Sequence, residues 1–134
     1  MFLLDTDAMS EVDKPNPDAG FVTWVTSVDW RDLYLSTITV AEMWEGIMLL
    51  PNSRKRRTLE GVFELLPQRF HSRIIPVDYS IAVTYAGLQA ERGPLPVLDC
   101  LIAATGLTRH LTIVTRNTRD MLRTGVRCLD PWTG

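Results

Sequence analysis

The stretch Phe2-Leu3-Leu4-Asp5-Thr6-Asp7 decides how the fold of this chain is interpreted. Three apolar residues followed by a carboxylate predict a short buried strand that presents an acid at its carboxyl end. Asp7 is a candidate cap for a helix that begins at Ala8. A strand, an acidic corner and a helix open an α/β unit, and such folds place ligands beyond the carboxyl ends of their strands. Asp5 is therefore a candidate site residue, although solvation of the strand's end would also explain it.

The rest of the chain alternates between strand and helix patterns. β-branched and apolar runs predict further strands at residues 33–37, 74–77, 111–115 and 126–129. Apolar residues at helical spacing predict helices at 19–27, 40–50, 54–66, 79–92 and 97–110, with a short one after 117. This alternation predicts an α/β fold, a three-layer α/β/α sandwich around a mainly parallel sheet.

Length and composition are those of an ordinary globular protein. The 134 residues, 46% hydrophobic and 22% charged, are enough for one domain over residues 1–134. No apolar run reaches the roughly 18 residues of a membrane helix, and no signal-peptide pattern opens the chain. We therefore expect a cytoplasmic protein with no membrane partner.

The residues available for chemistry are mainly carboxylates. Two histidines and two cysteines, His71, His110, Cys100 and Cys128, are scattered, which gives little support to a zinc site or a Ser-His-Asp triad. The net charge of −2 offers no global basic field of the kind that marks a nucleic-acid binder. Arginine supplies twelve of the fourteen basic residues, and its planar fork suits phosphate.

Three carboxylates hold similar positions relative to the predicted strands. Asp5 ends the first strand, Glu42 lies early in the helix after the second, and Asp99 opens the helix before strand 111–115. Asn117 follows the strand at 111–115 as Asp5 follows the first strand. Thr39 could cap its helix with Glu42 as capping-box partner, and a helix N-terminus favours a charge such as Asp99. However, Asp99 lies in a largely apolar helix, where a charge is costly unless it is paired.

Acids that converge on one sheet edge predict a metal site. Clustered carboxylates repel one another and have raised pKa values unless a cation neutralises them. Oxygen ligands without His or Cys favour Mg²⁺ or Mn²⁺. Such a centre typically activates water and neutralises a phosphoryl group.

Four motifs, in order and at the expected spacing, give the chain a family resemblance. Leu4 to Glu11 resembles the D-T-N-x-x-S-E start of PIN domains, and Ser36 to Glu42 resembles their second motif. Asp99 to Thr105 resembles the D-x-x-I-A-A-x helix, and Val114 to Asp120 resembles the V-T-R-N/D-x-x-D close. The chain is most similar to the VapC-like toxins of bacterial toxin–antitoxin pairs, including FitB-like members.

The resemblance implies a small Mg²⁺-dependent ribonuclease, usually a homodimer, that a cognate antitoxin silences. It makes Asp5, Glu42 and Asp99 the metal-binding acids. Asn117 matches a fourth catalytic position that is Asp in some members, and its amide brings no charge, which leaves a second metal ion open.

The resemblance also implies roles for residues around the acids. Thr6 and Thr115 would orient carboxylates or water. Asp7 stands where Asn is usual. Asp120 could compensate for Asn117 or cap the last helix. Arg116 and Arg119 could bind RNA phosphates or simply be solvated.

Other interpretations stay open at this stage. Haloacid-dehalogenase-like phosphatases also begin with a strand and a D-x-D corner, but they need a Thr or Val where Met9 stands, and a catalytic lysine. A degenerate PIN domain that only binds RNA or protein is the non-enzymatic alternative. The apolar helix 43–50 is either core or a face for an antitoxin or a second subunit. The basic run 54–57 is either a solvated helix face or a nucleic-acid contact.

Overall fold

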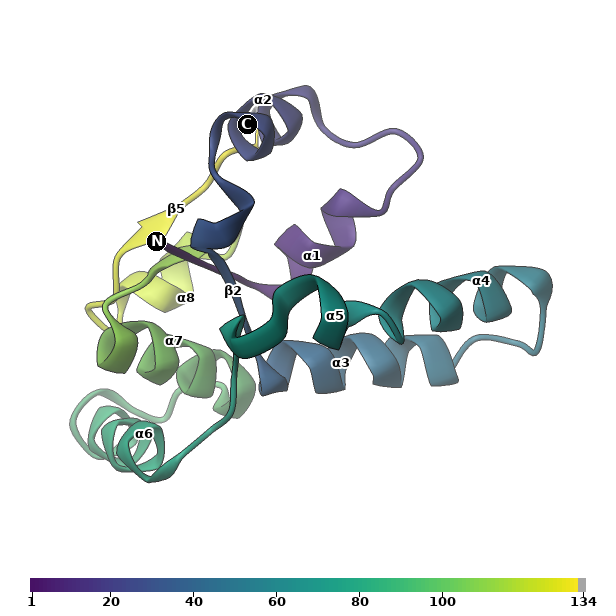
Figure 1. Ribbon diagram of the computed structural model, residues 1–134. Coiled ribbons are helices and arrows are strands. Elements are labelled where there is room, and N and C mark those ends of the chain that lie inside the picture. The colour runs from purple at the N-terminus through teal and green to yellow at the C-terminus, as the bar shows by residue number, and fades with distance from the viewer. Residues whose placement is uncertain (133–134) are drawn as a thin grey trace.

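The computed structural model describes residues 1–132 (Figure 1). Its centre is a parallel sheet in the strand order β3-β2-β1-β4-β5. Its strands are β1 (Phe2–Leu4), β2 (Leu33–Ser36), β3 (Ile74–Ile75), β4 (Thr112–Val114) and β5 (Cys128–Leu129). Every strand pair in this sheet is parallel, so all five carboxyl ends meet at the same edge. The predicted α/β class with a parallel central sheet is confirmed.

Helices connect the strands. They are α1 (Thr6–Val12), α2 (Ala19–Ser27), α3 (Thr37–Met48), α4 (Arg54–Phe63), α5 (Leu66–Phe70), α6 (Tyr79–Arg92), α7 (Val97–Arg109) and α8 (Thr118–Leu122). The prediction of one helix over 54–66 was wrong, because α4 ends at Phe63 and α5 starts with Pro67 in its first turn. Proline lacks the N–H that a continuing helix needs, but it is well suited to a first turn.

The sheet has a hydrophobic core on each face. Successive strand residues point to opposite faces, so Leu3 and Ile113 enter one core while Leu4 and Val114 enter the other. Helices α6, α7 and α8 cover the first face, and helices α1 to α5 cover the second. Figure 1 shows α6 and α7 on one side of the sheet and α1 and α5 on the other. The predicted three-layer sandwich is thereby confirmed.

Helices α3 and α4 pack side by side and form an arm that projects from the body (Figure 1). Met43 and Ile47 of α3 are buried in the core, whereas Met48 and Leu49 near its end are 62% and 78% exposed. The apolar helix of the sequence is thus core on one face and solvent-exposed near its end.

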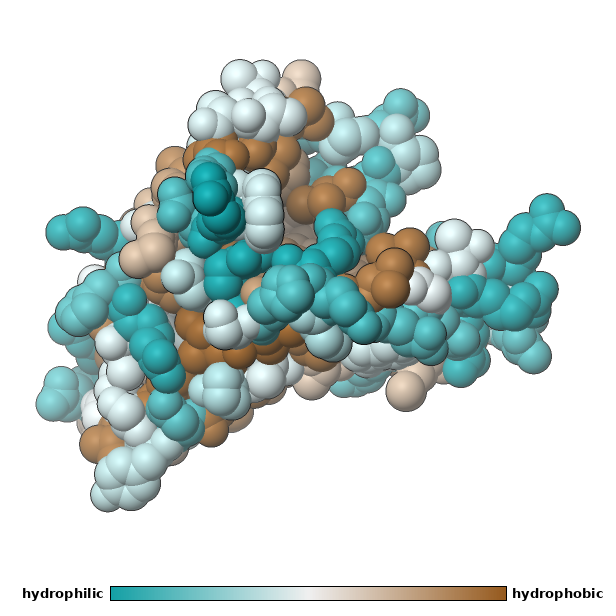
Figure 2. Space-filling model, in the orientation of Figure 1, coloured by the Kyte–Doolittle hydropathy of each residue, from teal (hydrophilic) through white to brown (hydrophobic). Residues whose placement is uncertain are grey.

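The end of this arm is hydrophilic in Figure 2. The basic run lies in the first turn of α4, where Arg54, Lys55 and Arg57 are exposed. The fourth member, Arg56, donates to Glu60 at 2.7 Å within the same helix. Three of the four cations therefore face solvent.

Gly106 lets α7 approach β4 closely. A Cβ at this position would lie 2.7 Å from Cδ1 of Ile113 and 2.9 Å from Cγ2 of Val126. A larger residue would push the helix outward, and with it Asp99 in the first turn of α7. Across residues 1–132, none of the helices combines the length and apolarity needed to cross a bilayer.

Candidate active site at the carboxyl edge of the sheet

Asp5 directly follows β1 and Thr115 directly follows β4. The two residues lie next to each other because these strands pair in register, Leu4 with Val114. The Thr115 hydroxyl donates to Oδ2 of Asp5 at 2.9 Å, and both residues are buried. The other carboxylate oxygen accepts from the backbone N–H of Thr6 at 2.8 Å. Asp5 is therefore the residue that caps α1, and the expectation that Asp7 caps a helix from Ala8 was wrong.

The surroundings of the Asp5 carboxyl disfavour its charged form. Its pKa is raised to about 6, mainly because burial disfavours the charged form. The negative charges of Asp7 and Asp99 raise the pKa further. The hydrogen bonds from Thr6 and Thr115 act in the opposite direction but do not offset burial.

Asp7 also faces the edge rather than serving as a helix cap. Its Oδ2 accepts from the backbone N–H of Arg116 at 2.9 Å and from the Thr115 hydroxyl at 3.4 Å. Its Oδ1 is buried and has no hydrogen-bond partner within residues 1–132. Burial raises the pKa of this carboxyl. A buried carboxylate oxygen without a donor is free to accept from a ligand or a cation.

Glu42 joins the site through Thr6, whose hydroxyl donates to Oε1 of Glu42 at 2.7 Å. The expected capping box was wrong, since Ser36 caps α3 by accepting from the N–H of Ile38 at 3.0 Å. Thr39 lies inside the helix, and its buried hydroxyl has no partner in the described chain. Because the helix starts before Thr39, Glu42 lies in its second turn and is free of a capping role.

Asp99 stands in the first turn of α7 and is held by Asn117, whose Nδ2 donates to Oδ2 of Asp99 at 3.3 Å. Burial raises the pKa of Asp99, and the charges of Asp120 and Asp7 raise it further. Asp120 does not cap α8, because that helix begins one residue after Asn117. Asp120 thus adds negative charge near Asp99.

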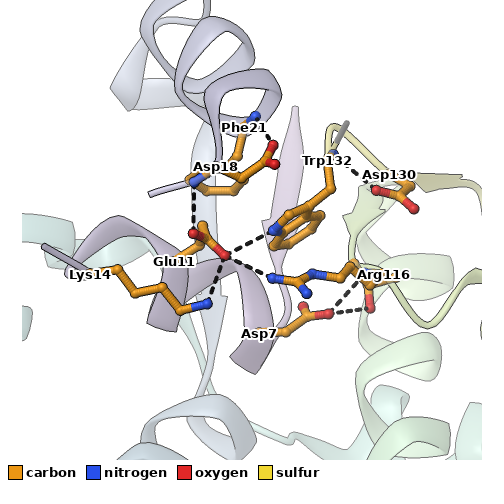
Figure 3. Close-up of polar contacts among 9 residues, drawn as sticks. Asp7, Glu11, Lys14, Asp18, Phe21, Arg116, Asp130 and Trp132 are labelled. Atoms are coloured by element: carbon orange, nitrogen blue, oxygen red, sulfur yellow. Dashed lines mark hydrogen bonds and ion pairs between the residues drawn. The ribbon is translucent and has the colours of Figure 1, made fainter. Parts of the chain in front are cut away.

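The two arginines expected to contact RNA lie differently. Arg119 is exposed in α8. Arg116 is half-exposed, but its Nη2 donates to Oε1 of Glu11 at 2.8 Å, and its guanidinium lies 4.5 Å from the centre of the Trp132 ring (Figure 3). Sequence reasoning missed this partnership. Two signals were available: Glu11 closes the first motif, and it follows Asp7 by four residues and so shares its helix face.

The structure brings the predicted residues to one edge without forming a closed metal cage. Asp5, Asp7 and Asp99 interact electrostatically, and Glu42 is connected to them by way of Thr6. In the chain up to Trp132, no three Asp, Glu, His or Cys side chains stand close enough together to enclose a metal ion.

Comparison with known proteins identifies the family. The PIN domain model matches residues 2–126. The chain belongs to the PIN domain family. This PIN domain is 37% identical to Toxin FitB of Neisseria gonorrhoeae over 98% of this chain and 99% of that protein. It is 35% identical to VapC ribonuclease Y4jK of Sinorhizobium fredii over 98% of both.

Solved structures confirm the fold. The crystal structure of FitAcB from Neisseria gonorrhoeae superposes on this PIN domain with a TM-score of 0.91 at 35% identity, and the match covers 100% of both chains. The predicted resemblance to the VapC-like and FitB-like toxins is thus confirmed at the level of the family.

Proposed function

We propose that this PIN domain is a Mg²⁺-dependent ribonuclease that acts as the toxin of a toxin–antitoxin pair. The observation that carries the proposal is the gathering of three acids with raised pKa values, the buried Asp5 and the partly buried Asp7 and Asp99, at the carboxyl edge of the sheet. The names of the relatives, Toxin FitB and VapC ribonuclease, support toxin and ribonuclease roles. An RNA substrate makes a cytoplasmic location part of the proposal.

The donor set fits Mg²⁺, or Mn²⁺, in its chemistry. Asp5, Glu42 and Asp99 would hold the ion, and all offer the carboxylate oxygens that these cations prefer. A cation would also stabilise the charged forms of Asp5 and Asp99, whose pKa values are raised by burial and, to a smaller extent, by repulsion from neighbouring acids. The partnerless Oδ1 of Asp7 is a further acceptor at the same edge.

When bound, Mg²⁺ supplies an acidified water and charge neutralisation on the phosphate. The chain's own residues keep the acids in place for that chemistry. The hydroxyl of Thr115 orients Asp5, the hydroxyl of Thr6 orients Glu42, and the amide of Asn117 orients Asp99. Asn117 accordingly has a positioning role and brings no charge. Arg119, exposed beside the site, is available to bind a flanking phosphate.

Two surfaces support the proposed partners. A groove of about 400 Å³ between α1, α3 and α4 has a mainly apolar lining that includes Met43, Ile47 and Phe63, and Glu42 lies in its wall. We assign it to an antitoxin segment, because an occupant there would also reach the acids. For a homodimer, helices α6 and α7 carry exposed apolar side chains, among them Tyr79 at the start of α6 and Val97 at the start of α7.

A catalytically degenerate module is the second candidate. It is favoured by the neutral Asn117 at the fourth position and by the absence, within residues 1–132, of three acids close enough to enclose an ion. Such a module would bind RNA or protein without cutting either.

Cleavage of a mixed tRNA and rRNA pool tests the proposal. We expect cleavage by the wild-type protein with Mg²⁺, and none with EDTA or with an Asp5→Asn variant prepared identically. The variant controls for contaminating nuclease, and Asn can still cap α1. Cleavage that persists in the variant would exclude the acid site as its source. Metal binding by calorimetry without turnover on any RNA would favour the binding module.

A further inference from the structure

Glu11 is a buried carboxylate on which four donors converge (Figure 3). It is 2% exposed. Its Oε1 accepts from Lys14 Nζ at 3.1 Å, from Arg116 Nη2 at 2.8 Å and from Trp132 Nε1 at 2.9 Å. Its Oε2 accepts from the backbone N–H of Asp18 at 2.9 Å. Both oxygens are therefore satisfied, and the buried charge is fully paired.

The donors come from parts of the chain that are far apart in sequence. Arg116 follows β4, and Trp132 lies in the segment after β5. The Trp132 ring also packs against Phe21 of α2, with ring centres 5.1 Å apart. Glu11 thus connects α1 and the loop after it to the C-terminal segment.

Arg116 connects this cluster to the acidic edge. Its side chain binds Glu11 and lies against Trp132, while its backbone N–H donates to Oδ2 of Asp7 at 2.9 Å. A residue held at its side chain has little freedom to move its own N–H. The position of the Asp7 carboxylate, whose charge acts on Asp5, therefore depends on Glu11.

We propose that Glu11 is a positioning residue for the acidic edge and acts on Asp7 through Arg116. By binding Trp132 as well, it makes the C-terminal segment part of the same support. The inference rests on the proposed ribonuclease function, because cleavage is where the position of Asp7 has its effect.

Lys14 provides a matched control. It donates to the same Oε1 as Arg116, but its side chain is 49% exposed and it has no hydrogen bond to the acids of the edge. A substitution at Lys14 removes one partner of Glu11 and leaves the path to Asp7 intact.

The test compares the kinetics of Glu11→Gln and Lys14→Gln on an RNA that the wild type cuts. Glutamine keeps the size of the side chain but presents an amide to donors that need a carboxylate. We expect kcat to fall roughly 10- to 100-fold for Glu11→Gln, as for other residues that orient site ligands. The KM should change little, and Lys14→Gln should stay within about twofold of the wild type. A folded Glu11→Gln protein with wild-type kcat would overturn the inference.

A double-mutant cycle with Asp7→Ala separates positioning from general destabilisation. If Glu11 acts through Asp7, adding Glu11→Gln to Asp7→Ala should lower kcat by less than about twofold further. If Glu11→Gln lowered kcat by the same factor in the Asp7→Ala background as in the wild type, the inference would be overturned. Should Glu11→Gln fail to fold, Arg116→Gln replaces it in the same cycle, because it removes the guanidinium that Glu11 binds and keeps the backbone N–H that donates to Asp7.

An NMR measurement keeps the result independent of RNA cleavage. The backbone amide resonance of Arg116 should shift in Glu11→Gln and stay in place in Lys14→Gln. An unchanged Arg116 resonance in folded Glu11→Gln would contradict the positioning role. Absence of cleavage by the wild type would instead count against the proposed function, and the resonance would still decide the inference.

Discussion

Asp5 and Glu11 are two buried carboxylates at opposite ends of α1, and their electrostatics differ in sign. Asp5 is 7% exposed and has a pKa of about 6, whereas Glu11 is 2% exposed and has a pKa of about 2. Burial opposes ionisation at both. The hydrogen bonds of Trp132 and Asp18 to Glu11, with the cation of Lys14, outweigh it there, while Asp5 has only two donors and negative neighbours. The number of partners, more than burial, decides whether a buried acid is structural or available for chemistry.

The contrast assigns different roles to the two ends of one short helix. At the Glu11 end every oxygen is satisfied, so the charge fastens chain segments together. At the Asp5 end the acids lack enough donors, which is the state that a cation would relieve. The proposed active site thus differs from the structural cluster around Glu11 in the hydrogen-bond donors that its acids lack.

RNA cleavage should respond most strongly to a substitution among the acids at the Asp5 end of α1. Asp99→Asn should reduce RNA cleavage by roughly three orders of magnitude or more, as removal of a catalytic group commonly does. The fold should be kept, because the amide has nearly the same shape and the position is at the surface of the α7 start. Single-turnover cleavage and circular dichroism measure the two quantities. An active, folded Asp99→Asn protein would refute the assignment of this acid.

The two carboxylates should respond oppositely to neutralisation when stability is measured. At pH 7, without metal, Asp5→Asn should raise the free energy of unfolding by up to about 3 kcal/mol, which is the cost of a pKa raised by about two units. Glu11→Gln should lower it, because four donors lose their carboxylate. Urea denaturation with EDTA present measures both. If both substitutions changed the free energy of unfolding in the same direction, the difference in hydrogen-bond partners between Asp5 and Glu11 would not explain their contributions to stability.

The pH dependence of stability should contain both contributions. The folded-state pKa of Glu11 is lowered from 4.5 to about 2, so its contribution is present above pH 4.5 and is lost as pH falls toward 2. The folded-state pKa of Asp5 is raised from 3.8 to about 6, so stability falls as pH rises from about 4 to 6. Between them, these two groups predict greatest stability near pH 4 to 5 in the absence of metal.

Variants identify each limb of that profile. Glu11→Gln should flatten the low-pH limb, and Asp5→Asn should flatten the fall above pH 4. Thermal unfolding from pH 2 to 8 with EDTA present makes the measurement. A wild-type profile that stays level between pH 4 and 6 would contradict the raised pKa of Asp5.

Stability should change least when an ion pair outside both the acidic edge and the Glu11 cluster is removed. Arg56 and Glu60 pair at 2.7 Å along α4, with about a third of each side chain exposed. Glu60→Gln should lower the free energy of unfolding by about 0.5 kcal/mol or less. Urea denaturation gives the value against which the Glu11 result is judged. If Glu60→Gln lowered the free energy of unfolding as much as Glu11→Gln does, the buried Glu11 cluster would contribute no more to stability than an ordinary surface ion pair.

Prediction from sequence succeeded where local patterns suffice. The strands were found because short apolar runs bounded by turn residues mark buried strands, although β3 and β5 proved shorter than expected. Helix starts were less well predicted. Asp7, Thr39 and Asp120 each resemble caps, yet Asp5, Ser36 and Asn117 hold the N-cap positions. Several residues at each start can accept a backbone N–H, and the end of the preceding strand decides among them.

The amino-acid sequence was enough to predict the α/β class, the family and the acids Asp5, Glu42 and Asp99 that gather at one edge of the sheet. The partners of each acid became known only from the folded chain. Glu11 meets Arg116 and Trp132, which lie 105 and 121 positions further along the chain. Local spacing carries no information about such contacts, because they form when distant segments pack together. The charge state of a buried acid depends on those contacts, so its chemistry is settled only in the folded chain.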